Sequence, residues 1–167
     1  MEVNTPLIEA KALKKYFKLG ENRYLHAVDN ITLQIYKGTT VGIVGESGCG
    51  KSTFGRTLLR LTEATSGEIL YCGENILTFG RQKMKQMRKN MQIIFQDPYA
   101  SVDPRKSVVE IIAEYMLIHH SYPTRREIFN RAAQLMDIVG LARRTANSYP
   151  HELDGGRRQR IGIARAL

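Results

Sequence analysis

Cysteine is scarce in this chain of 167 residues, which contains only Cys49 and Cys72. The two are far apart, so the sequence excludes a disulfide framework and weakly favours a reducing compartment. Long apolar runs are also missing: residues 93–95 form one of the longest, whereas a membrane span needs about 18. Residues 1–4 have neither the basic nor the apolar region of a signal peptide, and we expect none.

The composition excludes several other classes of protein. Hydrophobic residues make up 43% and charged residues 25% of the chain, which are globular values. They argue against a disordered, collagen-like or wholly coiled-coil chain. There is no internal repeat or low-complexity stretch. The length fits one domain with a core of its own, which needs no disulfide to hold it together.

The net charge is +9. A basic protein attracts polyanions such as nucleic acid, anionic lipid or nucleotide, but its lysines and arginines can equally be solvated. The basic residues gather in residues 81–89 and 157–165. Neither cluster is interleaved with aromatic residues, as a protein that binds single-stranded nucleic acid would prefer.

The first hundred residues are predicted to be rich in β-structure. Apolar and polar residues alternate over 31–36, the period of a half-buried strand, and Lys37-Gly38 indicates a turn. Residues 40–44 form a short apolar run, which predicts a strand buried on both faces. We expect further short strands at residues 68–71 and 92–95, and a helix over residues 52–61.

From Ser107 the pattern becomes helical. Ser107 and Thr124 are each followed three residues later by glutamate, the signature of a capping box at the start of a helix. Apolar residues then recur at helical spacing, and Gly140 is a suitable end for the second helix. A third helix is expected from Gly155 to Leu167. The organisation is therefore α/β with a helical insert.

Residues 45–52 carry the strongest motif, because they fit G-x-x-x-x-G-K-[ST] without a gap. In such a loop, glycines let successive backbone N–H groups point at phosphate oxygens, and the helix that follows adds its positive end. Lys51 supplies a positive charge for the β- and γ-phosphates, and the Ser52 hydroxyl is placed to bind Mg²⁺. Cys49 is either a small side chain that faces away or a thiol whose pKa the helix lowers.

Three segments stand in the order seen in ATPase subunits of ABC transporters. They are GESGCGKST at residues 45–53, QIIFQDPYASVDPR at 92–105 and YPHELDGGRRQRIGIARAL at 149–167. Their details resemble the ATP-binding subunits of oligopeptide, dipeptide and nickel importers. The resemblance covers essentially the whole chain.

The resemblance implies an α/β fold: a P-loop NTPase of ABC type with an N-terminal antiparallel β subdomain and a helical subdomain. Residues 1–167 would form one incomplete ATP-binding domain. Within it, 1–100 would be the β-rich nucleotide-binding part, 105–153 the helical insert, and 153–167 the signature motif and its helix.

The same resemblance implies roles for individual residues in binding ATP and Mg²⁺. Phe17, with Tyr16 as the alternative, would stack on adenine, although either could be a core aromatic. Lys51 and Gln96 would be catalytic, and Ser52 and Gln96 would approach Mg²⁺. The full nucleotide-binding set would be Tyr16, Phe17, Val28, Gly45, Glu46, Ser47, Gly48, Cys49, Gly50, Lys51, Ser52, Thr53 and Gln96.

The signature motif, which contacts the ATP of a partner subunit in this family, departs from the usual Leu-Ser-Gly-Gly-Gln. Here it is Leu153, Asp154, Gly155, Gly156 and Arg157. An ionised Asp154 cannot donate a hydrogen bond to phosphate, although aspartate is an excellent helix cap. We consider two hypotheses: Asp154 caps the helix while Arg157 contacts phosphate, or the site is degenerate. Arg158, Arg160 and Arg165 follow, either on a solvated face or against nucleotide or partner.

An ATPase of this family also needs an apolar strand ending in Asp-Glu and a later histidine, and neither is present. Strands of the central sheet beside the phosphate loop are missing too. We therefore expect the chain by itself to bind ATP weakly and to lack a general base for hydrolysis. It is expected to be a fragment of a longer protein, the alternative being a truncated product.

The resemblance implies partners as well. They are a second ATPase subunit (identical or paralogous), transmembrane permease subunits and, indirectly, an extracytoplasmic solute-binding protein, with no nucleic acid. The location would be peripheral, at the cytoplasmic face of the cell membrane. Two alternatives remain: a soluble ABC-type ATPase acting on nucleic acid or ribosomes, which the charge favours, and a non-hydrolysing regulatory fragment.

Overall fold

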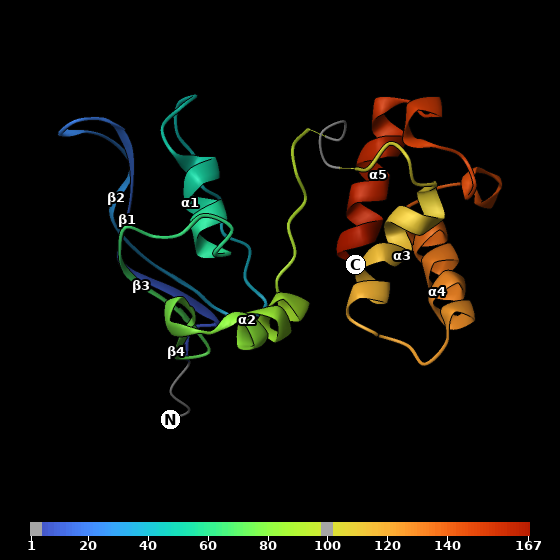
Figure 1. The fold of residues 1–167 in the computed structure, drawn as a ribbon, viewed down its shortest axis with the longest axis horizontal. Coiled ribbons are helices and arrows are strands. Elements are labelled where there is room, and N and C mark those ends of the chain that lie inside the picture. The colour runs from blue at the N-terminus through green and yellow to red at the C-terminus, as the bar shows by residue number, and fades with distance from the viewer. Residues whose placement is uncertain (1–4, 98–101) are drawn as a thin grey trace. The chain divides into compact units, whose positions relative to one another are not determined.

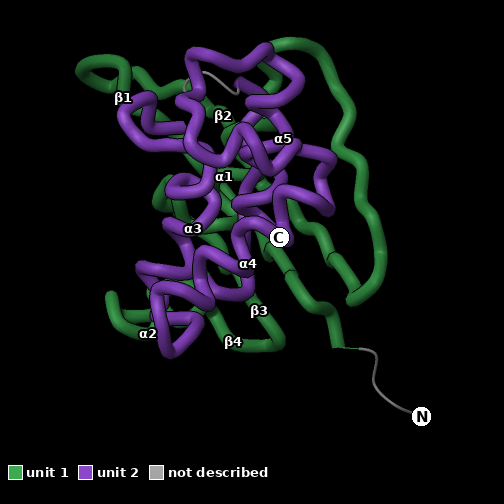
Figure 2. The backbone as a smooth tube through the Cα atoms, turned by 90° about the vertical axis from the view of Figure 1, so that its right-hand side faces the viewer, with its two compact units in different colours: residues 1–88 green, residues 89–167 purple. Residues whose placement is uncertain are grey.

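The computed structural model describes residues 5–97 and 102–167 (Figure 1). The chain divides into two compact units, residues 1–88 and residues 89–167 (Figure 2). We refer to them as unit 1 and unit 2 and describe each by itself.

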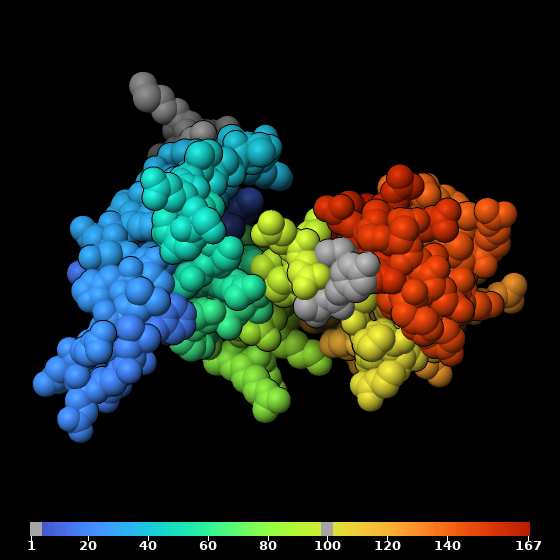
Figure 3. Space-filling view, turned by 90° about the horizontal axis from the view of Figure 1, so that it is seen from above, coloured from blue at the N-terminus to red at the C-terminus, as the bar shows by residue number. Residues whose placement is uncertain are grey.

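Unit 1 is built on an antiparallel sheet in the order β2-β1-β3-β4. The strands are β1 (Ile8–Gly20), β2 (Arg23–Ile35), β3 (Ser66–Tyr71) and β4 (Glu74–Asn75). The tip of the long β1–β2 hairpin projects from the rest of unit 1 (Figure 3). The strand predicted at residues 68–71 is confirmed, and the one predicted over 31–36 is present up to Ile35. The turn at Lys37-Gly38 is confirmed too, and Gly38 has a φ of 77°.

Short helical segments complete unit 1. They are α1 (Lys51–Leu58), η1 (Ile76–Thr78) and α2 (Arg81–Met87), and η2 (Arg88–Asn90) follows at the boundary with unit 2. Helix α1 packs against β1 and β2. The buried apolar residues of the sheet and of α1 include Ala10, Leu13, Val28, Phe54, Leu58 and Ile69.

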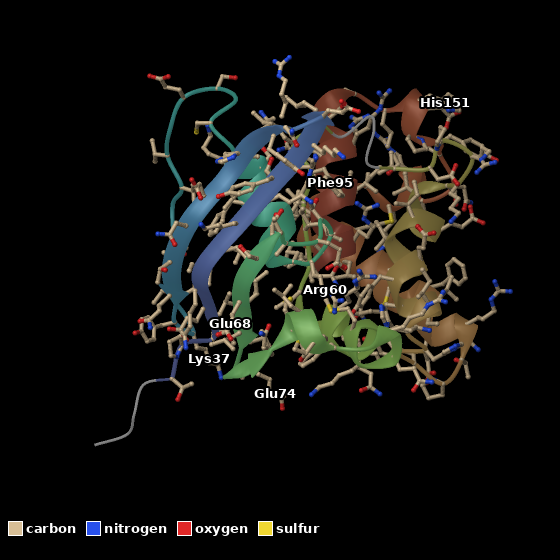
Figure 4. The ribbon with its side chains drawn as sticks, turned by 60° about the vertical axis from the view of Figure 1, so that its left-hand side comes forward. Lys37, Arg60, Glu68, Glu74, Phe95 and His151 are labelled. Atoms are coloured by element: carbon tan, nitrogen blue, oxygen red, sulfur yellow. The ribbon has the colours of Figure 1, made fainter. Side chains whose placement is uncertain are left out.

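The helix predicted over residues 52–61 is shorter than expected. It ends at Leu58 because Arg60 adopts a left-handed conformation, with a φ of 49°. The Arg60 guanidinium then donates hydrogen bonds to the carbonyl oxygens of Ile76 and Phe79, both at 2.8 Å (Figure 4). These contacts fix the end of α1 to the η1 turn, which periodicity along the helix alone does not reveal.

Two predicted strands, residues 40–44 and 92–95, are wrong, because neither segment is a strand in the structure. An apolar run signals burial, whereas a strand also needs a neighbour to hydrogen-bond with. Among the described residues of unit 1, no strand lies beside residues 40–44, and Val44 is 95% exposed. Residues 41–44 instead line a hollow of about 400 Å³ together with β2, Phe54 and the phosphate loop.

Unit 2 is helical. It contains α3 (Val108–Ile118), α4 (Arg125–Ile138) and α5 (Gly155–Ala166), with the short turns η3 (Arg143–Thr145) and η4 (Pro150–Glu152). The three long helices pack on one another around a single apolar core. Its most deeply buried large side chains are Val108, Ile111, Ile112, Met136 and Ile161.

Both predicted capping boxes are confirmed. The Ser107 backbone N–H and hydroxyl donate to the Glu110 carboxylate at 2.8 and 2.7 Å, and these bonds hold the pKa of Glu110 below its usual value. Thr124 Oγ1 accepts from the Glu127 N–H at 3.2 Å, while the Glu127 carboxylate accepts from the Thr124 N–H at 3.0 Å. Each box satisfies N–H groups that the first turn of a helix leaves open.

Gly140 also behaves as expected, with a φ of 71° just after the end of α4. The third predicted helix, from Gly155, is present as α5 and ends at Ala166.

Candidate functional site

The predicted phosphate loop runs from the exposed residues 45–49 directly into the first turn of α1. Gly48 and Gly50 have φ angles of 80° and 94°, which favour glycine. A Cβ at Gly50 would lie 2.0 Å from the carbonyl oxygen of Ala27, so the loop passes directly against β2. Glycine is therefore required at position 50 for two independent reasons, backbone conformation and space.

Lys51 is held inside this loop. Its Nζ donates to the carbonyl oxygens of Gly45 at 2.8 Å and Glu46 at 2.5 Å. The ammonium group is therefore already positioned where the loop curls, before any ligand arrives. Ser52 follows on the first turn of α1 and is exposed, as a residue that reaches a bound metal ion must be.

The N-terminus of α1 is open. Within the described part of the chain, no side chain caps this helix, whose N-cap position is Gly50. Uncapped N–H groups and the helix dipole together attract an anion. Glycine turns, an open helix end and a preplaced lysine are the features that a triphosphate and its Mg²⁺ require, so the residues present fit this ligand.

Cys49 lies within the same loop and is a free, exposed cysteine. Its Sγ is 3.5 Å from the Lys51 Nζ. A Cβ at Gly45 would lie 2.7 Å from this sulfur, so the side chain stays close to the loop rather than leaving it.

The two adjacent aromatic residues on β1 have different surroundings. The Tyr16 hydroxyl donates to Asp29, and its ring stacks on His26 with 3.9 Å between centroids. The hydrogen bond raises the pKa of Tyr16 and lowers the pKa of Asp29. Phe17, which points to the other face of the strand, is 38% exposed and carries the Lys15 Nζ 4.8 Å from its ring centre.

Sequence reasoning missed the Asp29 and His26 contacts of Tyr16. The hairpin pairs Tyr16 with His26, but its register shifts by one residue between Lys18 and Gly20, so the turn at residues 20–23 does not by itself locate these contacts. Val28, assigned to the nucleotide site, pairs with Lys15 and is buried at 2% exposure.

Gln96 is exposed and lies in unit 2, whereas the phosphate loop belongs to unit 1. It is followed by Asp97, the last described residue before position 102. Residues 98–101 of the matched segment lie outside the described residues.

The signature motif begins α5. Asp154 is the N-cap: its Oδ1 accepts from the Arg157 N–H at 2.8 Å, and its Oδ2 lies 3.3 Å from the Arg157 Nε. The backbone hydrogen bond is the main reason that the pKa of Asp154 lies below its usual value. The capping role predicted for Asp154 is confirmed. Leu153 is buried, and Gly155 and Gly156 form the first turn of the helix.

Arg158 fits neither alternative considered from the sequence, a solvated face or a contact with nucleotide or partner. It is 8% exposed, and its guanidinium donates to the carbonyl oxygens of Pro150 at 2.5 Å and His151 at 3.2 Å. A buried guanidinium needs such acceptors, and here they fasten the η4 turn to α5. Arg160 likewise donates to the Gly140 carbonyl oxygen at 2.9 Å. His151 itself stacks on Tyr149 (Figure 4).

Two features are absent from residues 5–97 and 102–167. No group of three or more histidine, cysteine or acidic residues is arranged to hold a metal ion. Within the same residues, none of the helices combines the length and the apolarity needed to cross a membrane.

Comparison with known proteins decides the family. A family model described as "ABC transporter" matches residues 28–167, which contain the phosphate loop and the signature motif. The chain belongs to the ABC transporter family.

Among curated relatives of this ABC protein is the oligopeptide transport ATP-binding protein OppF of Bacillus subtilis (strain 168). It is 52% identical over 162 residues, covering 96% of this chain and 53% of that protein. OppF of Escherichia coli (strain K12) is 43% identical over 169 residues, covering 96% of this chain and 51% of the relative. The chain thus spans about half the length of the curated relatives it matches.

Solved structures with the same fold include a dimeric structure of MJ0796, described as a bacterial ABC transporter cassette. It shares 30% identity with a TM-score of 0.85 and covers 96% of this chain and 68% of that one. A dimeric post-hydrolysis state of the same ATP-binding cassette, bound to ADP and Pi, gives 29% identity and a TM-score of 0.84, with the same coverage. The predicted fold, an ABC-type cassette with an antiparallel β part and a helical part, is confirmed.

Proposed function

We propose that the protein to which this chain belongs is the ATP-binding, energy-coupling subunit of an ABC importer for peptides or a related small solute. The observation that carries the proposal is the phosphate loop, in which Gly50 packs on β2 while Lys51 is held in the curl of the loop. The relatives named above are oligopeptide transport ATP-binding proteins, which supports the class of solute.

In this proposal the backbone N–H groups of residues 45–53 and the N-terminus of α1 bind the phosphates of ATP. Lys51 turns from the carbonyl oxygens of Gly45 and Glu46 toward the β- and γ-phosphates, and Ser52 holds Mg²⁺. Bound Mg²⁺ neutralises charge that develops on the phosphates. Gln96 approaches the metal and the attacking water. Since the loop is largely formed in advance, the rate gain comes from positioning and electrostatics.

Phe17 is the better candidate for stacking on adenine. A ring that stacks must keep an open face, and Phe17 is partly exposed. The Tyr16 ring is already stacked on His26, and its hydroxyl is bonded to Asp29. Tyr16 therefore supports the strand, whereas Phe17 is available to the nucleotide.

We expect Phe17→Ala in the full-length protein to weaken Mg·ATP binding about tenfold, because stacking on a base contributes about 1–3 kcal/mol. Tyr16→Phe is the matched control, since it keeps the ring and removes only the bond to Asp29, and it should change the affinity less than about twofold. Isothermal titration calorimetry of both variants measures this. If Tyr16→Phe weakens binding more than Phe17→Ala, the assignment of the two rings is reversed.

The proposed assembly has two such subunits, identical or paralogous, docked on transmembrane permease subunits at the cytoplasmic face of the membrane. An extracytoplasmic solute-binding protein delivers the solute, and no nucleic acid takes part. In this arrangement the signature motif of one subunit faces the ATP of the other. The dimeric cassettes of similar fold support the pairing.

At the signature, Arg157 replaces the missing hydroxyl donor of position 154 as the contact to the γ-phosphate. Asp154 faces its own helix, where it caps α5 and pairs with Arg157, so its negative charge is partly compensated. The opposing hypothesis, a degenerate site, predicts that the Asp154 carboxylate repels the phosphate.

The two hypotheses predict opposite effects of Asp154→Ser on ATP hydrolysis by the complete importer reconstituted with its membrane subunits. If Arg157 contacts phosphate, serine keeps the cap but no longer orients the guanidinium. The rate should then fall about two- to fivefold, as expected for one exposed ion pair. Asp137→Ser, which removes a carboxylate paired with Arg143, is the control and should leave the rate unchanged. A rise of tenfold or more in the hydrolysis rate of Asp154→Ser would contradict the hypothesis that Arg157 contacts the phosphate and compensates Asp154.

A further inference from the structure

Lys15 has no role in the function proposed above, although it contacts the ring that we assign to adenine. Lys15 and Phe17 are two residues apart on β1, so their side chains lie on the same face of the strand. The Lys15 Nζ stands 4.8 Å from the centre of the Phe17 ring. This is within the distance of about 6 Å at which a cation is attracted to the face of an aromatic ring.

The ring is the partner that the structure gives to this ammonium group. The preceding lysine has a carboxylate instead, because the Lys14 Nζ lies 3.8 Å from Asp29. Within the described part of the chain, the Lys15 side chain has no ion pair and no hydrogen bond. It is nevertheless half-buried, and partial removal of water strengthens the attraction between a cation and a ring.

A β-bulge places this part of β1 close to the phosphate loop. The ladder between β1 and β2 shifts its register between Lys15 and Tyr16, so β2 has one extra residue there, Ala27. The carbonyl oxygen of Ala27 is the atom that Gly50 of the loop approaches. Bulges are common next to active sites, where they change the direction of side chains. The contact between Lys15 and Phe17 is thus one strand away from the loop that would bind the phosphates of the same nucleotide.

A cation on one face of an aromatic ring leaves the other face for a base. It also restricts the rotamers of the ring, because turning the ring away breaks the contact. Without this restriction, a partly exposed phenylalanine moves freely, and a ligand that stacks on it must immobilise the side chain when it binds. The attraction depends on charge, so an arginine at position 15 can replace the lysine.

We propose that Lys15 is a positioning residue of the nucleotide site: it holds one face of the Phe17 ring and so presents the other face to adenine. The inference rests on the proposed function and adds to the site a residue that contacts neither the base nor the phosphates. Removal of the Lys15 charge should therefore weaken binding through the base and leave binding of the phosphate chain unchanged.

The test is a calorimetric titration of the full-length protein with Mg·ATP and, in parallel, with magnesium tripolyphosphate, which has phosphates but no base. Lys15→Met keeps the apolar stem and removes the charge, and it should weaken ATP binding about two- to fivefold. Lys15→Arg keeps a cation over the ring and should stay within about 1.5-fold of the wild type. The affinity for tripolyphosphate should be the same in all variants.

Lys18→Met is the matched control. It removes the charge of an exposed lysine that directly follows Phe17 and lies on the opposite face of β1, where it pairs with Tyr24. Since exposed charges away from the site are screened by salt, ATP binding should change less than about 1.5-fold.

A double-mutant cycle shows whether Lys15 acts through the ring. In a Phe17→Ala background, Lys15→Met should no longer change the affinity for ATP. Three results would overturn the inference: unchanged ATP binding in Lys15→Met, the full effect of Lys15→Met without the ring, or an equal loss of tripolyphosphate binding. The last two would mean that Lys15 contacts phosphate or that the strand is disturbed.

Failure of this inference can be distinguished from failure of the proposed function. If Phe17→Ala weakens ATP binding and Lys15→Met does not, only the role of Lys15 is wrong. If Phe17→Ala has no effect while the wild type binds ATP, the assignment of the adenine ring is wrong, and the role of Lys15 with it. If the wild-type protein binds no ATP, the proposed function itself is contradicted.

Discussion

Gly50→Ala is expected to abolish nucleotide binding and to destabilise the cassette. The new Cβ would lie 2.0 Å from the Ala27 carbonyl oxygen, and alanine is strained at a φ of 94°. The loop must then move away from β2. A displacement of about 1 Å at such a site lowers the catalytic rate about 10²-fold. We expect the affinity of the full-length protein for Mg·ATP to fall at least that much, and the free energy of unfolding to drop by about 2–4 kcal/mol.

Gly55→Ala is the matched control for this prediction. It makes the same chemical change five residues further on, in the body of α1, where a Cβ meets no atom within 4 Å. Alanine is also the better helix former, so this variant should be as stable as the wild type or more stable by about 0.5–1 kcal/mol. Calorimetry and thermal melting of the two variants give the comparison. Equal affinities in Gly50→Ala and Gly55→Ala would contradict the proposed role of the loop.

Lys51→Met is expected to reduce ATP hydrolysis by the reconstituted complex about 10²–10³-fold. The methionine side chain keeps much of the length and apolar stem of lysine but has no charge. A single preplaced donor aimed at developing charge typically contributes this much to the rate. In the structure the ammonium is held within the loop, with its Nζ 2.8 Å from the Gly45 carbonyl oxygen, and it turns from there toward the phosphates.

The control for charge removal is Lys85→Met, which replaces an exposed lysine on α2 in the same unit. It should leave hydrolysis within about twofold of the wild type, since exposed charges far from the site are screened by salt. If Lys51→Met keeps more than a tenth of the wild-type rate, Lys51 does not have the role proposed here.

The parts of the structure that are predictable from the sequence depend on partners a few residues apart. The boxes at Ser107 and Thr124 need only a glutamate three residues later, and both form. The phosphate loop is equally local, since its glycines and Lys51 lie within seven consecutive residues. Motifs of this kind carry their own geometry, so spacing along the chain is enough to locate them.

The parts that were not predictable depend on partners far along the chain. Residues 40–44 have the composition of a buried strand, but pairing requires a neighbouring strand, and composition does not report one. The burial of Arg158 is a similar case, since its acceptors are carbonyl oxygens of a turn that carries no special sequence signal. The choice between Tyr16 and Phe17 needs the hairpin register, which brings His26 and Asp29 to Tyr16.

The signature motif lies between these cases. The capping role of Asp154 follows from its place just before Gly155-Gly156, and the structure shows it. Only the structure shows that Arg157 both donates its backbone N–H to this carboxylate and pairs with it through its side chain. That Arg143 pairs with the Asp137 carboxylate could not be anticipated, because the sequence does not distinguish Arg143 from the adjacent Arg144.

The most direct test of the account is a calorimetric titration of the full-length protein with Mg·ATP, alongside Lys51→Met. We predict one ATP per chain with a dissociation constant between about 1 μM and 1 mM, the range of ordinary enzyme substrates. ADP should compete for the same site, and Lys51→Met should weaken ATP binding at least about tenfold. Absence of binding to the wild-type protein, or equal binding to Lys51→Met, would contradict the claim that residues 45–53 form its ATP site.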